Sequence, residues 1–111
     1  MENKGFETAK VMDFAAMVEY SENCIISKRV LDKKTGNVTL FSFDKGQRLS
    51  EHTAPFDALV QCIDGEVEIL IDSNPFRLTA NQSIIMPANI PHAVNAVTKF
   101  KMLLTMIKEI G

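Results

Sequence analysis

The stretch GQRLSEHTAPFDALVQCIDG, from Gly46 to Gly65, decides the fold of this chain of 111 residues. A second stretch, NQSIIMPANIPHAVNA, runs from Asn81 to Ala96. Each stretch contains one of the protein's two histidines, which are His52 and His92. Between them lie short apolar runs separated by turn residues, a pattern that is typical of antiparallel strands. We therefore expect strand pairing to bring both histidines into a single barrel.

The segment Glu66–Asp72 shows the clearest strand pattern. Its β-branched residues alternate with carboxylates, except at Leu70, so one face is apolar and the other is mostly polar. The Asp-Gly pair at 64–65 is a strong turn signal, and Gly36–Asn37 is expected to supply the turn of an earlier hairpin. About eight short strands with little room for helix predict an all-β sandwich or barrel. The expected strands cover residues 24–31, 38–43, 58–63, 66–72, 76–79, 83–87, 92–98 and 100–107.

The chain is expected to form one domain, because a chain of this length buries a single core. Asp13 is placed to cap a short helix in which Phe14, Met17 and Val18 share one face. We expect residues 1–23 to form an N-terminal segment that carries this helix and packs on the barrel. Residues 24–108 are expected to form the barrel itself.

The composition excludes some partners. Twelve basic and fourteen acidic residues give a net charge of −2, so nothing favours binding to nucleic acid. The apolar runs are far shorter than the ~20 residues of a membrane helix, and the first residues lack the pattern of a secretory signal. We therefore expect no membrane partner and a cytoplasmic location. Cys24 and Cys62 are expected to be reduced and to pack as small apolar residues.

Two of the expected strands are apolar on both faces. In residues 58–63 and 102–107, apolar side chains occupy both sets of alternating positions. One face can line the barrel, but the other needs a cover. The N-terminal segment is one candidate, and a second copy of the chain is the other, so we predict a homodimer.

The first stretch resembles a motif of the cupin superfamily, and in particular of its small single-domain members. In that motif, five residues separate a glycine from a first histidine, and one residue separates the first histidine from a second. Three residues then precede a glutamate, and six more precede a final glycine. Gly46, His52 and Gly65 match it. Ala54 stands at the position of the second histidine, and Ala58 stands at that of the glutamate.

The second stretch is similar to the other cupin motif, in which a proline, a histidine and an asparagine follow two glycine positions at fixed spacing. Pro87 and His92 match, while Asn81 and Asn89 replace the glycines and Ala96 replaces the asparagine. Asparagine tolerates the left-handed backbone conformation that glycine favours, so these replacements are mild. The resemblance implies a single jelly-roll barrel. It also implies a divalent metal held by three histidines and a glutamate, of which only His52 and His92 are present.

Three interpretations of the histidine pair remain open at this point. His52 and His92 could hold a divalent transition metal, helped by Asp57, Glu51, Cys62 or water. They could instead recognise a small polar molecule without metal, in a pocket lined by Val60, Cys62 and Met86, with Phe41 or Phe43 as further candidates. They could also be an inert, hydrogen-bonded remnant of a metal site.

Two functions follow from these interpretations. The first is a binding or sensing module that holds a small polar molecule between His52 and His92, with or without a weakly bound divalent metal. The second is an enzyme of the cupin type. It would be a metal-dependent oxygenase or isomerase, or a metal-free isomerase with a histidine as base. The sequence leaves open whether the protein is an enzyme.

Overall fold

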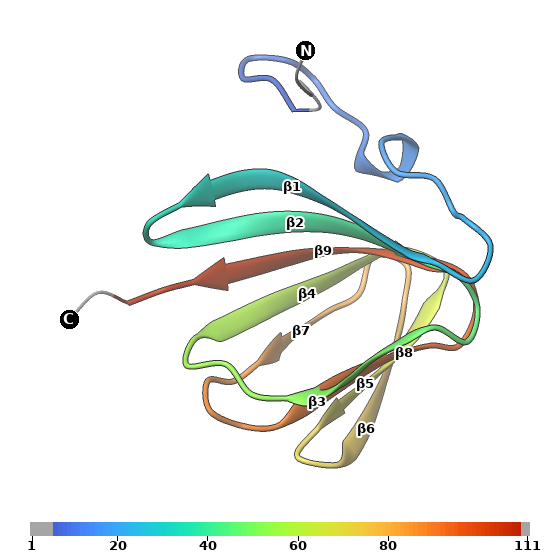
Figure 1. Ribbon diagram of the computed structural model, residues 1–111, viewed down its shortest axis with the longest axis vertical. Helices are drawn as coiled ribbons and strands as arrows, with labels where there is room; N and C mark the ends of the chain where they lie inside the picture. The colour runs from blue at the N-terminus through green and yellow to red at the C-terminus, as the bar shows by residue number, and fades with distance from the viewer. Residues whose placement is uncertain (1–5, 110–111) are drawn as a thin grey trace.

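The chain forms nine antiparallel strands and one short 3-10 helix within residues 6–109, the part that the computed structural model describes (Figure 1). The strands form two sheets that face each other, one of five strands in the order β1-β2-β9-β4-β7 and one of four in the order β3-β8-β5-β6. The expected all-β jelly-roll barrel is confirmed. The elements are η1 (Phe14–Ala16), β1 (Ile25–Lys33), β2 (Gly36–Phe43), β3 (Arg48–His52), β4 (Asp57–Asp64), β5 (Glu66–Ile71), β6 (Asn74–Thr79), β7 (Ser83–Met86), β8 (His92–Ala96) and β9 (Phe100–Ile107).

The core lies between the two sheets. Alternation on each strand turns every second side chain inward, as in Val67 and Ile69 of β5, both of which are fully buried. The end of β2 and the start of β9 pair where the sheets meet, on the right in Figure 1. Phe43 and Phe100 occupy these two strand ends, and their rings stack with the centroids 4.5 Å apart. The connections β3–β4 and β7–β8 lie at the opposite end, where the sheets diverge.

Gly36 does not form the hairpin turn that the sequence predicts. Lys33 pairs with Gly36, so the turn between β1 and β2 is made by residues 34 and 35. A Cβ atom at Gly36 would lie 2.4 Å from the main-chain oxygen of Met106. Glycine is therefore required there because β2 and β9 approach closely, and not because of a turn.

Gly65 forms a corner between the sheets and not a hairpin turn. The strands on either side of it, β4 and β5, belong to different sheets. Gly65 has a φ of +78°, and a Cβ atom there would meet the carbonyl oxygen of Lys99 and the Cα of Phe100. Both the backbone angle and the lack of a side chain let the chain pass from one sheet to the other.

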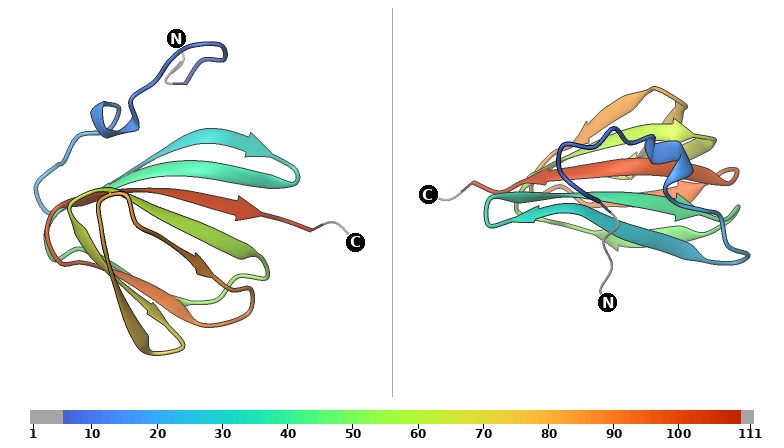
Figure 2. Two further views of the ribbon diagram at one scale, coloured as in Figure 1. Left: turned by 180° about the vertical axis from the view of Figure 1, so that it is seen from behind. Right: turned by 90° about the horizontal axis from the view of Figure 1, so that it is seen from above.

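The N-terminal segment packs on the outer face of the five-stranded sheet (Figure 2). The expected cap is present, because the Asp13 side chain accepts a hydrogen bond from the Ala15 N–H at 3.2 Å, although the helix is one 3-10 turn. Val18 is 1% exposed, and the Ser42 hydroxyl donates to the carbonyl of Glu19 at 2.8 Å. The segment therefore covers part of the second apolar face.

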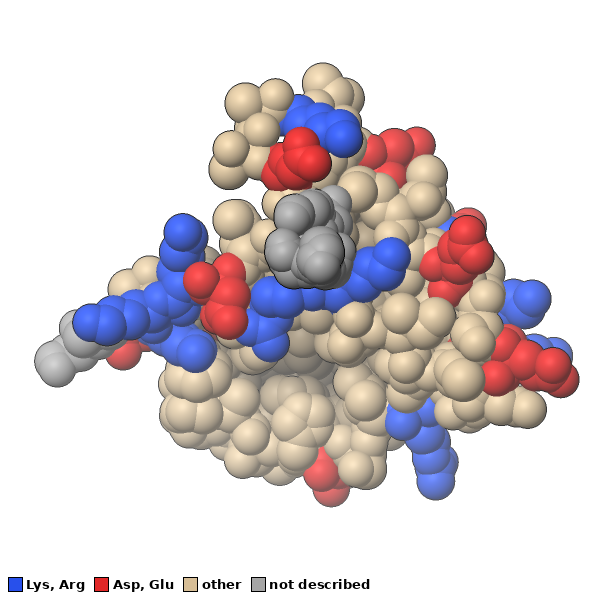
Figure 3. All heavy atoms as spheres, turned by 45° about the horizontal axis from the view of Figure 1, so that its top comes forward, with Lys and Arg blue, Asp and Glu red and all other residues tan. Residues whose placement is uncertain are grey.

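Charges of both signs are interspersed on the surface drawn in Figure 3. Neither the basic nor the acidic side chains dominate that face, as the small net charge predicts. In the described part of the chain, no helix is long and apolar enough to cross a membrane.

Candidate functional site

The structure brings the two histidines of the chain into contact. His52 ends β3 and His92 begins β8, and the two residues pair across these neighbouring strands. Their Nε2 atoms are 3.2 Å apart, and the ring planes meet at 72°. Directly opposed residues of an antiparallel pair lie on the same face of the sheet, so both imidazoles reach the same place.

A hydrogen bond joins the loop that follows His52 to the loop that precedes His92. Asn89, in the β7–β8 loop, has a φ of +66°, and its N–H donates to the carbonyl of Ala54 at 2.7 Å. Asn81, the other asparagine that replaces a motif glycine, has a φ of +75°. Both asparagines therefore adopt the left-handed backbone conformation that is expected at positions where the motif has glycine.

The second ring nitrogen of each histidine faces a backbone carbonyl. Nδ1 of His52 lies 2.8 Å from the oxygen of Ser50, and Nδ1 of His92 lies 3.3 Å from the oxygen of Ile90. A carbonyl oxygen only accepts hydrogen bonds, so both contacts are hydrogen bonds in the tautomer that carries the proton on Nδ1. In the neutral imidazole the Nε2 atom then has a free lone pair.

With both protons on Nδ1, two unprotonated nitrogens lie 3.2 Å apart. Such an arrangement is repulsive unless a positive centre lies between the nitrogens or beside both. A proton, a metal ion or a hydrogen-bond donor of a ligand can fill this role. The pair is thus suited to hold an electron-poor group.

The two imidazoles differ in their exposure to solvent. His92 is 5% exposed, whereas His52 is exposed at the edge of the four-stranded sheet. Burial, and then the nearby His52, lower the pKa of His92 below its ordinary value. His92 is therefore neutral at pH 7.

A cavity of about 70 Å³ lies beside the histidine pair, between the two sheets. It is smaller than the roughly 300–1,000 Å³ of a typical drug-sized pocket, but it exceeds what one water needs. Apart from the two imidazoles its walls are apolar and carry no charged group. The lining residues are Leu49, His52, Ala54, Ala58, Met86, His92, Val94, Met102, Leu104 and Met106.

Met86 lines the cavity as the sequence predicts, but Val60 and Cys62 do not. The expected parity is correct, since Ala58, Val60 and Cys62 all face the core. The cavity, however, occupies only the end of the barrel near Ala58. Val60 and Cys62 lie progressively further along β4, where side chains fill the space between the sheets. Phe41 and Phe43 are likewise absent from the lining and pack in the core.

Cys62 does not join the histidines. Its Sγ lies 3.6 Å from the carbonyl oxygens of Asp64 and Gly65, at the other end of β4. Burial raises the pKa of its thiol to about 11. The thiol therefore stays protonated at neutral pH and packs as an apolar group.

The carboxylates near the motif do not replace the missing glutamate. Asp57 points out of the barrel and accepts a hydrogen bond from the Ala88 N–H at 2.9 Å, and Glu51 is exposed. Within residues 6–109, no three His, Cys, Asp or Glu side chains cluster closely enough to hold a metal. The residues present therefore do not fit a centre of three imidazoles and one carboxylate.

The sequence prediction of the pocket omitted two methionines of β9, Met102 and Met106. A signal for them was available, because the alternation along residues 102–107 places both on one face with Leu104. The pairing of β9 with β4 then turns that face into the barrel, with Ala58 opposite Met106 and Cys62 opposite Met102. This long-range pairing is not visible in the local pattern.

Solved structures with the same fold support this description. A conserved protein of unknown function from Streptococcus pyogenes is 38% identical over 96% of this chain and 94% of its own, with a TM-score of 0.91. A cupin superfamily protein from Desulfitobacterium hafniense is 26% identical, with 98% and 100% coverage and a TM-score of 0.89. A cupin 2 conserved barrel domain protein from Leptotrichia buccalis is 45% identical over 85% of this chain but only 46% of its own, with a TM-score of 0.82.

No curated protein matches the chain. The family model described as a cupin domain matches residues 39–108, which include both histidine stretches, most of β2 and the strands from β3 to β9. With its two facing sheets and its paired histidines, this chain belongs to the cupin domain family.

Proposed function

We propose that this cupin-type protein is a binding module that holds a small polar ligand, molecule or ion, between His52 and His92. The observation that carries the proposal is the pair of Nε2 atoms 3.2 Å apart, both of which are unprotonated when each Nδ1 donates to its backbone carbonyl. A ligand with a hydrogen-bond donor or a positive charge relieves the repulsion between them. The apolar walls of the cavity strengthen that interaction, because they exclude water.

The size and opening of the cavity limit the ligand. A volume of about 70 Å³ accommodates an ion or a few non-hydrogen atoms. A larger molecule can place only one polar end there and must leave the rest outside, beyond the exposed His52. The ligand is therefore either a small hydrogen-bond donor, such as an amine, an amide or an alcohol, or a metal ion.

Thermal unfolding tests this function across a panel of such compounds. A ligand at about 100 times its Kd adds about 2.7 kcal/mol to the stability of the folded state. For a domain of this size, that corresponds to a rise in Tm of roughly 10 °C. We expect at least one hydrogen-bond donor or metal ion to raise the Tm of the wild-type protein and to leave the Tm of His52→Ala unchanged.

Two variants serve as controls. Thr53→Ala changes an exposed side chain next to His52 and should keep the full rise in Tm. His92→Gln removes the buried imidazole and should abolish the rise. The proposal is wrong if no compound or ion raises the Tm of the wild type, or if His52→Ala and His92→Gln keep the rise that the wild type shows.

A further inference from the structure

From the side chains that face the histidine pair, we infer that the ligand is a soft monovalent metal ion, with Cu⁺ and Ag⁺ as the chemical class. The inference rests on the proposed function, because it uses the same two Nε2 atoms. It differs from the divalent centre that the cupin motif implies, since Ala54 and Ala58 take the place of an imidazole and the only carboxylate.

The histidines are already arranged as metal ligands usually are. Two nitrogens bound at about 2.0–2.1 Å to one tetrahedral ion are roughly 3.3 Å apart. The observed separation of His52 and His92 is 3.2 Å. The Nδ1 atom of each imidazole also faces a backbone carbonyl, and a hydrogen bond at this position is the usual way in which a protein fixes the tautomer and direction of a ligating histidine.

Methionines occupy the wall opposite the histidines. Ala58, at the position of the motif glutamate, pairs with Met86 on one side and with Met106 on the other. Cross-strand neighbours on one face have Cβ atoms about 5 Å apart, so Met86 and Met106 both lie beside the position where the alanine replaces the glutamate. Met86 and Met106 line the cavity together with His52 and His92.

The donors therefore come from both sheets. The nitrogens belong to β3 and β8 of the four-stranded sheet, and the sulfurs belong to β7 and β9 of the five-stranded sheet. Facing sheets lie about 10 Å apart, so side chains from each side can meet halfway. Met102 also lines the cavity, but it pairs with Cys62, which is four residues further along β4 than Ala58.

The chemistry of these donors selects a soft ion. Thioether sulfur binds Cu⁺ well and binds hard or borderline divalent ions poorly. The cavity walls also lack a carboxylate that could balance the second charge of a divalent ion. A neutral set of two imidazoles and two thioethers therefore favours a single positive charge in this apolar cavity.

The experiment measures metal affinity directly in a Cys24→Ser background, because the exposed thiol of Cys24 would itself bind soft metals. Cu⁺ affinity is measured without oxygen by competition with a chromophoric chelator, and Ag⁺ and Zn²⁺ affinities by calorimetry. The test variant is Met86→Leu with Met106→Leu, which keeps the side-chain volumes nearly constant. We expect it to bind Cu⁺ and Ag⁺ at least tenfold more weakly, with the affinity for Zn²⁺ unchanged.

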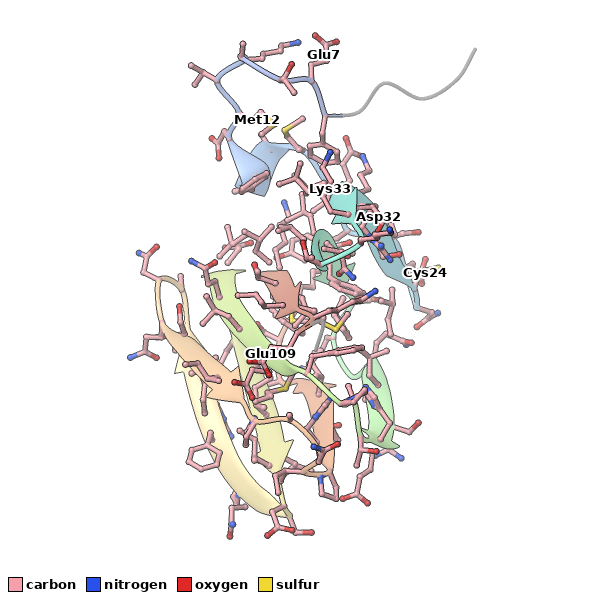
Figure 4. All side chains as sticks on the ribbon, turned by 90° about the vertical axis from the view of Figure 1, so that its left-hand side faces the viewer. Glu7, Met12, Cys24, Asp32, Lys33 and Glu109 are labelled. Atoms are coloured by element: carbon pink, nitrogen blue, oxygen red, sulfur yellow. The ribbon has the colours of Figure 1, made fainter. Side chains whose placement is uncertain are left out.

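The control variant carries Met12→Leu and Met17→Leu. Both methionines belong to the N-terminal segment, and Met12 lies outside the two sheets in Figure 4. This variant should bind Cu⁺ and Ag⁺ as the Cys24→Ser protein does. X-ray absorption of the Cu⁺ form should show sulfur as well as nitrogen neighbours around the metal.

The outcomes separate this inference from the proposed function. If Cu⁺ and Ag⁺ bind equally well to the Met86/Met106 variant, or if the metal has only nitrogen and oxygen neighbours, the methionine site is wrong. If an organic donor or a divalent ion raises the Tm through His52 but Cu⁺ and Ag⁺ do not bind, the inference fails and the proposed function stands. If nothing binds at all, both are wrong.

Discussion

The tautomers of His52 and His92 depend on the carbonyl two residues before each histidine. Ser50 and Ile90 supply these oxygens, and both hold the proton on Nδ1. The sequence predicts that the two histidines share a cavity, because the motif spacing indicates that both belong to strands of one barrel. It does not predict their tautomers, since ring orientation depends on backbone angles that the spacing of residues leaves undefined.

Gly65 is the single residue on which the joint between the sheets depends most. Its φ is +78°, and a Cβ atom would lie 2.0 Å from the oxygen of Lys99. Gly46 has a φ of +83° but open space around it. We expect Gly46→Ala to cost about 1 kcal/mol of backbone strain and Gly65→Ala to cost roughly 3 kcal/mol or more. Urea unfolding measures both, and equal losses would contradict the close approach.

Asp44 should make stability depend on pH. Hydrogen bonds from the N–H groups of Asn23, at 2.6 Å, and Lys45, at 2.9 Å, lower the pKa of this carboxyl below its ordinary 3.8. The stabilisation is therefore present above about pH 4 and is lost as the pH falls through the lower, folded-state pKa. We expect Asp44→Asn to lower the urea midpoint at pH 7 and to have a smaller effect at pH 3. A difference that is the same at both values would refute this.

The strand β3 is the element that the sequence prediction missed. Its five residues, RLSEH, lack β-branched side chains, and only Leu49 faces the core. β3 forms because its backbone pairs with β8 at the edge of the sheet, across an irregularity between Leu49 and His52. Strands with strong alternation, such as β5, were predicted correctly because their side chains alone specify the two faces.

The N-terminal segment should stabilise the barrel through Val18. This side chain is 1% exposed, whereas Val11, in the same segment, is 98% exposed. Val18→Ala removes the equivalent of two buried methylene-sized groups, so we expect it to cost about 2 kcal/mol, including the cavity term. Val11→Ala should leave stability unchanged within about 0.5 kcal/mol. Chemical unfolding compares the two, and similar effects would show that the segment does not pack as described.

At the scale of the whole molecule, two sheets contribute different chemistry to one cavity. The all-β class and every strand except β3 follow from alternation and turn residues that the sequence displays, whereas the order of the strands in the sheets does not. The sequence does not show which residues line the pocket, because this depends on the point along β4 at which side chains fill the space between the sheets. Val60 and Cys62 share the inward face with Ala58, yet only Ala58 borders the cavity.

Part of the outer face of the five-stranded sheet remains open beyond the N-terminal segment. Ile85 and Ile107 on this face are 61% and 66% exposed. The predicted homodimer would cover them, since an exposed apolar patch on a sheet favours a second copy. We expect Ile107→Lys to shift sedimentation velocity toward the monomer. Phe76→Lys, on the exposed edge strand β6 of the other sheet, should not. A wild-type protein that is monomeric at all concentrations would contradict the prediction.

The central claim is that the Nε2 atoms of His52 and His92 are both unprotonated and bind one ligand together. Nitrogen-15 NMR of the two imidazoles, recorded with Ag⁺ bound, tests this claim most directly. We predict that both Nδ1 atoms carry a proton, that neither Nε2 does, and that both Nε2 signals show scalar coupling to silver. A spectrum in which one Nε2 is protonated and donates a simple hydrogen bond to the other, with no silver coupling, would contradict this result.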